Sequence, residues 1–166
     1  MPISADLLTW DTGVTHLTNN LAGTETLTYY IHDVSSSYIS VGDGYGSSYS
    51  HVSYEEDYIV SVFDSIDPYI DLDFTRVYTY NGSDLDIYNL YSHSGWSSDI
   101  LGTTWSMDYG VNSWFDLAWR YTADWENDRN TIIHEIGHSL GLDHPGGDGW
   151  NADYTVDDTV MSYNEG

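Results

Sequence analysis

The chain has 166 residues, enough for one domain with a sizeable core and too few for two ordinary domains. It contains no cysteine, which excludes disulfides, thiolate metal ligands and a cysteine nucleophile. Its 27 acidic residues and 3 basic residues give a net charge of −24. This charge argues against nucleic acid or an anionic membrane surface as a partner, because the phosphates of either would be repelled.

The acidity itself has two interpretations. We interpret it as an adaptation to a salty medium, where self-repulsion is screened; the alternative is a preference for cationic substrates or for Ca²⁺. No run approaches the roughly 18 apolar residues that a membrane-spanning helix requires. Residues 1–6 lack the basic and apolar regions of a secretory signal.

The first half of the chain predicts one strand and one helix. Residues 1–25 are rich in Thr, Asn and Gly and predict an irregular lead-in with a short strand at most. The β-branched and aromatic residues of 26–32 predict a strand, and the Ser/Gly-rich stretch 35–50 predicts a flexible loop. Ser53 is a candidate N-cap for a helix whose apolar residues recur at helical spacing until Pro68 ends it.

The second half predicts further strands and a second helix. Segments 72–78, 85–91 and 100–107 are strand candidates, and 114–119 is another. Asn127 or Asp128 is expected to cap the second helix, which runs to about Leu140. This order of elements predicts a single α+β domain covering residues 1–166.

The second helix carries the strongest chemical signal of the chain. His134, Glu135 and His138 form an H-E-x-x-H pattern, and residues four apart lie on the same face of a helix, so both imidazoles can bind one zinc ion. Glu135 lies beside the metal and can take a proton from its bound water. Gly141 can adopt the left-handed conformation that ends helices, and the turned chain can bring His144 back as third ligand. Three protein ligands leave one position open, as catalytic zinc sites do.

A second motif follows near the end of the chain. H-E-x-x-H alone also occurs in helices that bind nothing, but here the extended pattern H-E-x-x-H-x-x-G-x-x-H is followed by the segment 159–163, Thr-Val-Met-Ser-Tyr. This combination is the metzincin signature. Since His144 is followed by Pro145 and Gly146, and the methionine stands in Val-Met-Ser-Tyr, the chain resembles the serralysin branch of the metzincins.

The resemblance implies a fold and roles for several residues. It implies a twisted, mostly parallel sheet with an antiparallel edge strand, two helices, an upper part of about residues 1–144 and a small lower part of about 145–166. It implies that Met161 forms a turn beneath the metal and that Tyr163 is a displaceable zinc ligand that can donate a hydrogen bond to the developing oxyanion. The edge strand, for which 100–107 is the candidate, would pair with an extended peptide substrate.

The expected function is therefore a zinc-dependent endopeptidase in which Glu135 is the general base and then returns the proton to the departing amine. The resemblance also implies secretion and a protein or peptide substrate, and we expect a monomer. Serralysins continue beyond the methionine into a further helix and calcium-binding repeats, whereas this chain stops at Gly166, so we expect an isolated catalytic domain or a minimal version. The acidic segment 146–153 and residues 157–158 could hold a structural Ca²⁺, but a solvated loop on the lower rim is favoured.

Two alternatives to this function stay open. Within enzymes, an astacin-like or other metzincin protease is possible, although Pro145 and the lack of cysteines count against the astacin type. In a different class, seven tryptophans and sixteen tyrosines could form the sugar-stacking surface of a secreted, acidic carbohydrate-binding or adhesive module. The four remaining histidines follow no ligand spacing and are expected to be structural or exposed: His16, His32, His51 and His93.

Overall fold

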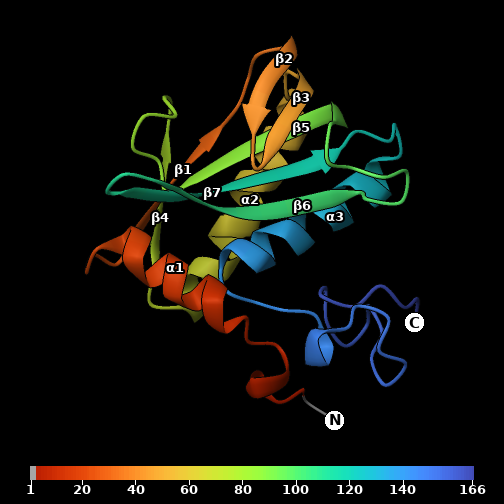
Figure 1. Cartoon of the computed structure of the whole chain (residues 1–166). Coiled ribbons are helices and arrows are strands. Elements are labelled where there is room, and N and C mark those ends of the chain that lie inside the picture. Colours follow the sequence, from red (N-terminus) through yellow and green to blue (C-terminus); the bar gives the residue numbers. More distant parts are fainter. Residues whose placement is uncertain (1–2) are drawn as a thin grey trace.

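The computed structural model describes residues 3–166 and contains three α-helices, three short 3₁₀ turns and seven strands within that range. In chain order the longer elements are α1 (Asp11–Leu21), β1 (Thr26–Ile31), β2 (Ser36–Val41), β3 (Gly44–Tyr49), α2 (Ser53–Ile66), β4 (Asp73–Val77), β5 (Leu85–His93), β6 (Gly102–Tyr109), β7 (Asn112–Arg120) and α3 (Trp125–Ser139). Figure 1 shows one sheet with α2 and α3 on the same face and an irregular C-terminal segment below it.

All seven strands belong to one mixed sheet. β1 is parallel to β4 and β5, and β5 is parallel to β7. The hairpin β2–β3 joins β5 in antiparallel fashion beyond the end of β1, and β6 is antiparallel to β7 at the opposite edge. The described part of the chain thus contains three parallel and three antiparallel pairings, and β6 pairs with β7 alone.

The main core lies between the sheet and its helices. Alternate residues of the central strands, such as Leu85 and Ile87 of β5 and Leu117 of β7, are fully buried beneath Ile59 of α2 and Ile132 of α3. The period of two along the strands and the helical spacing on α2 and α3 bring these side chains onto facing surfaces. A smaller apolar cluster on the other face includes Tyr88, Leu90 and Ala118, with Val41 from the end of β2.

The prediction of an α+β domain is confirmed, but the predicted helix count and sheet type need correction. There are three helices, not two, because residues 11–21 form α1 within the segment expected to be an irregular lead-in; residues 1–2 of that segment lie outside the described residues. The sheet is evenly mixed rather than mostly parallel with a single antiparallel edge. In the described residues, no helix is long and apolar enough to cross a membrane.

The stretch 35–50 was expected to be a flexible loop, and this prediction is wrong. It forms the hairpin β2–β3, whose strands bury only small or isolated side chains such as Val41 and Ser48. The turn is anchored, because the Gly42 amide donates to the Asp116 carboxylate at 2.7 Å. Because this stretch is rich in serine and glycine, it lacks the alternating apolar residues that predict a strand. It forms strands nevertheless, because β3 pairs with β5.

Both helices begin earlier than predicted: the N-cap of α2 lies one residue before the predicted Ser53, and the N-cap of α3 lies three or four residues before the predicted Asn127 or Asp128. α2 begins at Ser53 itself and its N-cap is Val52, whose amide donates to the Glu55 carboxylate at 2.8 Å. α3 begins at Trp125, and Asp124 is the N-cap that accepts hydrogen bonds from the amides of residues 126 and 127. The four strands predicted between residues 72 and 119 are confirmed as β4 to β7.

Candidate metal centre

The three histidines of the motif converge on one point. The ligand-capable nitrogens of His134, His138 and His144 all lie within 4.8 Å of one another, and the Nε2 atoms of His134 and His144 are 3.2 Å apart. His134 and His138 come from successive turns of α3, and His144 comes from the chain that follows the helix. In the described residues, this is the one group of His, Cys, Asp or Glu side chains close enough to hold a metal ion.

Backbone carbonyls fix the orientation of two of these imidazoles. The Nδ1 atom of His134 lies 2.7 Å from the Val160 carbonyl oxygen, and that of His138 lies 2.8 Å from the Leu142 carbonyl oxygen. A carbonyl can only accept, so each Nδ1 carries the proton and each Nε2 keeps its lone pair for a ligand. Burial lowers the pKa of His134 to about 4 and also lowers the pKa of His138, which keeps both rings neutral.

The turn after α3 is a Schellman motif that returns the chain toward the helix. Gly141 has a φ of +88°, its amide donates to the His138 carbonyl at 3.0 Å, and the Leu142 amide donates to the Gly137 carbonyl at 3.0 Å. The N-terminal segment braces this turn: the Trp10 amide donates to the Gly141 carbonyl, and the Asp143 amide donates to the Leu8 carbonyl, both at 2.8 Å. The position of His144 is therefore set by residues from both ends of the chain.

Tyr163 and Met161 lie at the site as well, on the irregular C-terminal segment. The Tyr163 hydroxyl is 2.8 Å from Nε2 of His144, and its ring stacks on His134 with centroids 5.1 Å apart. Met161 is fully buried beneath α3, where a Cβ on Gly137 would come within 2.7 Å of its sulfur. Burial raises the pKa of Tyr163 to about 12, so the phenol keeps its proton in the absence of a cation.

The side chain of Glu135, the residue after His134, contacts the edge strand β6. Its side chain is buried, and the Thr104 hydroxyl lies 2.9 Å from both its carboxylate and its backbone carbonyl. Burial raises the pKa of Glu135 to about 8, partly offset by the hydrogen bond from Thr104. Gly102 leaves room for this arrangement, because a Cβ there would come within 2.7 Å of the Glu135 side chain.

The donor set fits a zinc ion. Three neutral imidazole nitrogens are a typical ligand set of a catalytic zinc ion, and the absence of thiolates and carboxylates among the converging atoms disfavours iron–sulfur or calcium chemistry. The acidic residues 148, 153, 157 and 158 do not form such a group. Two of them cap local turns: the Asp148 carboxylate accepts from the Trp150 amide at 2.9 Å, and the Asp158 carboxylate accepts from the Thr155 amide at 3.1 Å.

Several of these contacts could not be foreseen from the motif. Thr104 and Gly102 lie on the strand that was expected to border the cleft, but the sequence does not reveal which of its residues reach Glu135. The bracing residues Leu8 and Trp10 belong to a segment that was expected to be irregular. Trp150 was also missed: it is 68% exposed and stands edge-on to Tyr163 with ring centroids 5.4 Å apart.

Comparison with known proteins gives a partial similarity. No protein-family model matches the chain. It is 37% identical over 94 residues to serralysin of Proteus mirabilis, a match covering 56% of this chain and 17% of that protein. It is 39% identical over 80 residues to serralysin A of Dickeya chrysanthemi, covering 44% and 16% of the two chains, and 36% identical over 75 residues to serralysin C of the same organism, covering 45% and 13%. The chain thus spans less than a fifth of the length of these relatives.

Proposed function

We propose that this chain is the catalytic region of a secreted, zinc-dependent endopeptidase of the serralysin type. The observation that carries the proposal is the convergence of three imidazoles within 4.8 Å beside a buried carboxylate, Glu135. The partial identity to serralysins supports this branch over the astacin type. The mixed sheet, with β6 as an antiparallel edge, is compatible with a metzincin-like domain.

The metal would be held by His134, His138 and His144, with the Tyr163 hydroxyl as a further, displaceable ligand. Bound there, Zn²⁺ supplies a Lewis acid that lowers the pKa of a water molecule and polarises a peptide carbonyl. Met161 packs beneath the helix that carries two of the ligands and supports their position.

The residues of the chain supply proton transfer and orientation. Glu135 takes the proton of the attacking water and gives it to the departing amine, while the Thr104 hydroxyl fixes its carboxyl group from the strand side. Tyr163 moves away from the histidines when the peptide binds, and its phenol donates a hydrogen bond to the oxygen that becomes negative.

The substrate would bind as an added strand. Within residues 3–166, β6 pairs with β7 on one side only, so the amides and carbonyls of its outer edge can pair with an extended peptide. Because Thr104 and Gly102 of β6 contact Glu135, a peptide paired with this edge passes beside the catalytic carboxylate.

Cleavage of a labelled peptide or casein, with and without 1,10-phenanthroline, tests the proposal. We expect close to one zinc per chain, cleavage that the chelator abolishes, and recovery on addition of zinc. The variant Glu135→Ala should keep its zinc and lose activity by roughly 10²–10⁴-fold. Glu126→Ala, on the exposed start of α3, is the matched control and should cleave like the parent chain. Cleavage that resists the chelator, or full activity of Glu135→Ala, would overturn the assignment.

A further inference from the structure

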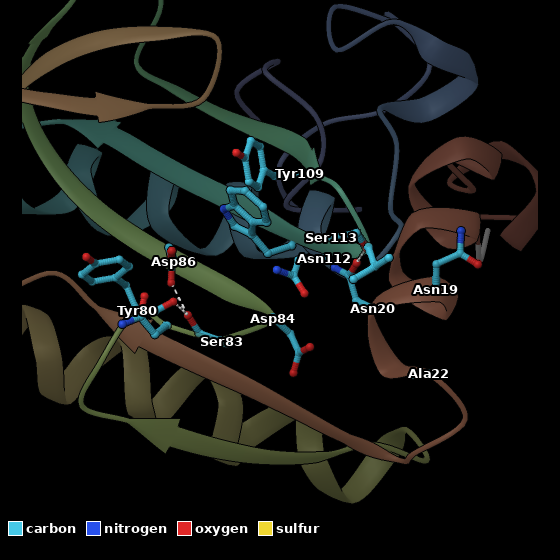
Figure 2. A pocket seen from close by; sticks show the side chains of 14 residues that line it. Asn19, Asn20, Ala22, Tyr80, Ser83, Asp84, Asp86, Tyr109, Asn112 and Ser113 are labelled. Atoms are coloured by element: carbon cyan, nitrogen blue, oxygen red, sulfur yellow. Dashed lines mark hydrogen bonds between the residues drawn. The ribbon is translucent and has the colours of Figure 1, made fainter.

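A second site lies away from the histidines, in a cavity of about 470 Å³. Three segments that are distant in sequence meet there: the end of α1, the loop between β4 and β5, and the turn between β6 and β7 (Figure 2). Its size falls within the roughly 300–1,000 Å³ typical of small-molecule sites. None of its lining residues belongs to the metal centre.

Three carboxamides line this cavity without an internal partner. Asn19, Asn81 and Asn112 are exposed, and their side chains make no hydrogen bond to any residue in the described range 3–166. Each carboxamide offers two donors and one acceptor oxygen. Since a hydroxyl group both donates and accepts, three free carboxamides around one cavity suit a ligand with several hydroxyls.

The carboxylates of the cavity are already occupied by neutral donors. Asp84 accepts from the Thr28 amide at 2.7 Å and from the Thr28 hydroxyl at 2.6 Å. Asp86 is buried and accepts from the Ser83 hydroxyl. The lining contains no Lys or Arg, so it does not attract anions, and one oxygen of each of its two acids accepts a hydrogen bond that helps to hold the loop between β4 and β5.

Aromatic rings complete the walls. Tyr80 and Tyr109 are 63% and 78% exposed, and Figure 2 shows them around the cavity together with Asn112 and Asp86. The Trp114 indole is held in place because its Nε1–H donates to the Asp116 carboxylate at 2.9 Å, and Asp116 is in turn bound by the Gly42 amide. Because the indole is already held in one position, a ligand that packs against its apolar face would cause little further loss of side-chain entropy.

We infer that this cavity is a binding site for a neutral saccharide, recognised by the carboxamides of Asn19, Asn81 and Asn112 and by the aromatic walls that include Trp114. A sugar ring has hydroxyls at its rim and C–H groups on its faces, which matches free carboxamides around aromatic rings. A hydrogen bond between Asn20 and Ser113 joins α1 to β7 at the edge of the cavity. The site is independent of the proposed peptidase activity.

The test is titration of the full chain with cellobiose, maltose and N,N′-diacetylchitobiose, followed by calorimetry and by amide NMR shifts. We expect saturable one-to-one binding of at least one disaccharide, with shifts confined to residues 19–22, 80–86 and 109–114. Asn112→Ala and Asn19→Ala should each weaken binding by roughly threefold to tenfold, the effect of one lost hydrogen bond. Asn130→Ala, an exposed carboxamide of α3, is the matched control and should bind like the parent chain.

Three results would overturn the inference. The first is the absence of binding by all three disaccharides, and the second is binding whose NMR shifts lie elsewhere in the chain. The third is binding of spermidine at these residues without binding of any disaccharide, which would make the cavity a cation site. Because each variant replaces an exposed side chain, its circular dichroism spectrum should match that of the parent chain, so that a loss of binding reports on contact with the ligand.

Discussion

The two parts of the molecule that form the candidate metal centre differ in how each is stabilised. α3 brings His134, Glu135 and His138, and it is fixed to the sheet by fully buried residues such as Ile132 and Ile136. The segment 145–166 brings Met161 and Tyr163, but only Pro145, Gly149, Met161 and Ser162 are buried in it.

Hydrogen bonds donated by side-chain amides to backbone carbonyls take the place of a core in this lower segment. The Asn164 amide group donates to the carbonyls of Asn151 and Tyr154 at 2.8 and 3.0 Å, and the Asn151 amide group donates to the Pro145 carbonyl at 3.1 Å. Such bonds contribute about 1 kcal/mol each, whereas a fully buried Ile contributes about 1.5–3 kcal/mol. Packing therefore preorganises the part of the candidate site that lies on α3, whereas the part on 145–166 relies on local hydrogen bonds and on any ligand that joins it to α3.

The largest expected effect is that metal removal loosens the lower segment and leaves the sheet unchanged. A metal bound by His134, His138 and His144 ties residues 141–166 to α3, and at a zinc concentration one hundred times the Kd this linkage is worth about 2.7 kcal/mol. We therefore expect hydrogen exchange in 145–166 to accelerate by roughly a hundredfold after chelation, with no change in β5 and β7.

The variant His144→Ala provides the control for this experiment. It should show the faster exchange already in zinc and should not respond further to the chelator. Equal acceleration of hydrogen exchange in β5 and in the lower segment would contradict this expectation, because it would show that the two parts open as one unit.

An intermediate effect is expected at the contact between β6 and Glu135. Thr104→Val keeps the shape of the side chain but removes the hydroxyl 2.9 Å from the carboxylate, so Glu135 loses its fixed orientation. If the proposed activity holds, kcat should fall by roughly tenfold to a hundredfold, the effect of one hydrogen bond to a charged group, with little change in KM or zinc content.

Thr104→Ser should restore most of this activity, because it returns the hydroxyl. Ser106→Ala, two residues along the same exposed strand, is the matched control and should leave kcat unchanged. A fall in kcat that serine does not rescue would assign the effect to packing of β6 instead of to the hydrogen bond.

The smallest expected effect is a change in the pH dependence of stability that arises from Asp86, a buried residue of β5. Burial and the neighbouring Asp116 raise the pKa of Asp86 from 3.8 to about 7. The folded chain therefore binds the proton more tightly than the unfolded chain, and this stabilising contribution is complete below about pH 4 and is lost as the pH rises to about 7. Asp86→Asn should remove this part of the pH dependence and raise the free energy of unfolding most clearly above pH 7.

Urea unfolding of the variant and the parent chain from pH 4.5 to 8 measures this difference. Asp99→Asn, at an exposed loop position, should run parallel to the parent chain throughout. A constant difference between Asp86→Asn and the parent chain over the whole range would show that Asp86 does not titrate differently in the folded state. Exchange in 145–166 should be the same in both chains, since Asp86 lies outside the lower segment.

The sequence predicts those elements of the fold that are specified by their own residues and misses those that depend on distant partners. The strands β4 to β7 and the helices α2 and α3 have apolar residues at regular spacing, and this local signal suffices to place them. The convergence of His134, His138 and His144 was predicted from the H-E-x-x-H-x-x-G-x-x-H spacing, because one helix turn and one glycine turn determine most of their geometry.

The missed elements are those that depend on distant partners. α1 buries few residues of its own, among them His16, whose Nε2 lies 2.8 Å from the Trp114 carbonyl almost a hundred residues away. The hairpin β2–β3 owes its strands to pairing with β5. Likewise, the contact of Thr104 with Glu135 joins two elements whose relative position no local pattern encodes.

The brace between residues 8–10 and the turn 141–143 has a consequence for any shortened version of the chain. Deleting the first ten residues would leave the three converging histidines in the chain but would remove the Leu8 carbonyl and the Trp10 amide that hold the turn before His144. A shortened chain that begins at Asp11 should therefore retain its helices and sheet but bind zinc more weakly than the parent chain, because the turn before His144 would lose its brace.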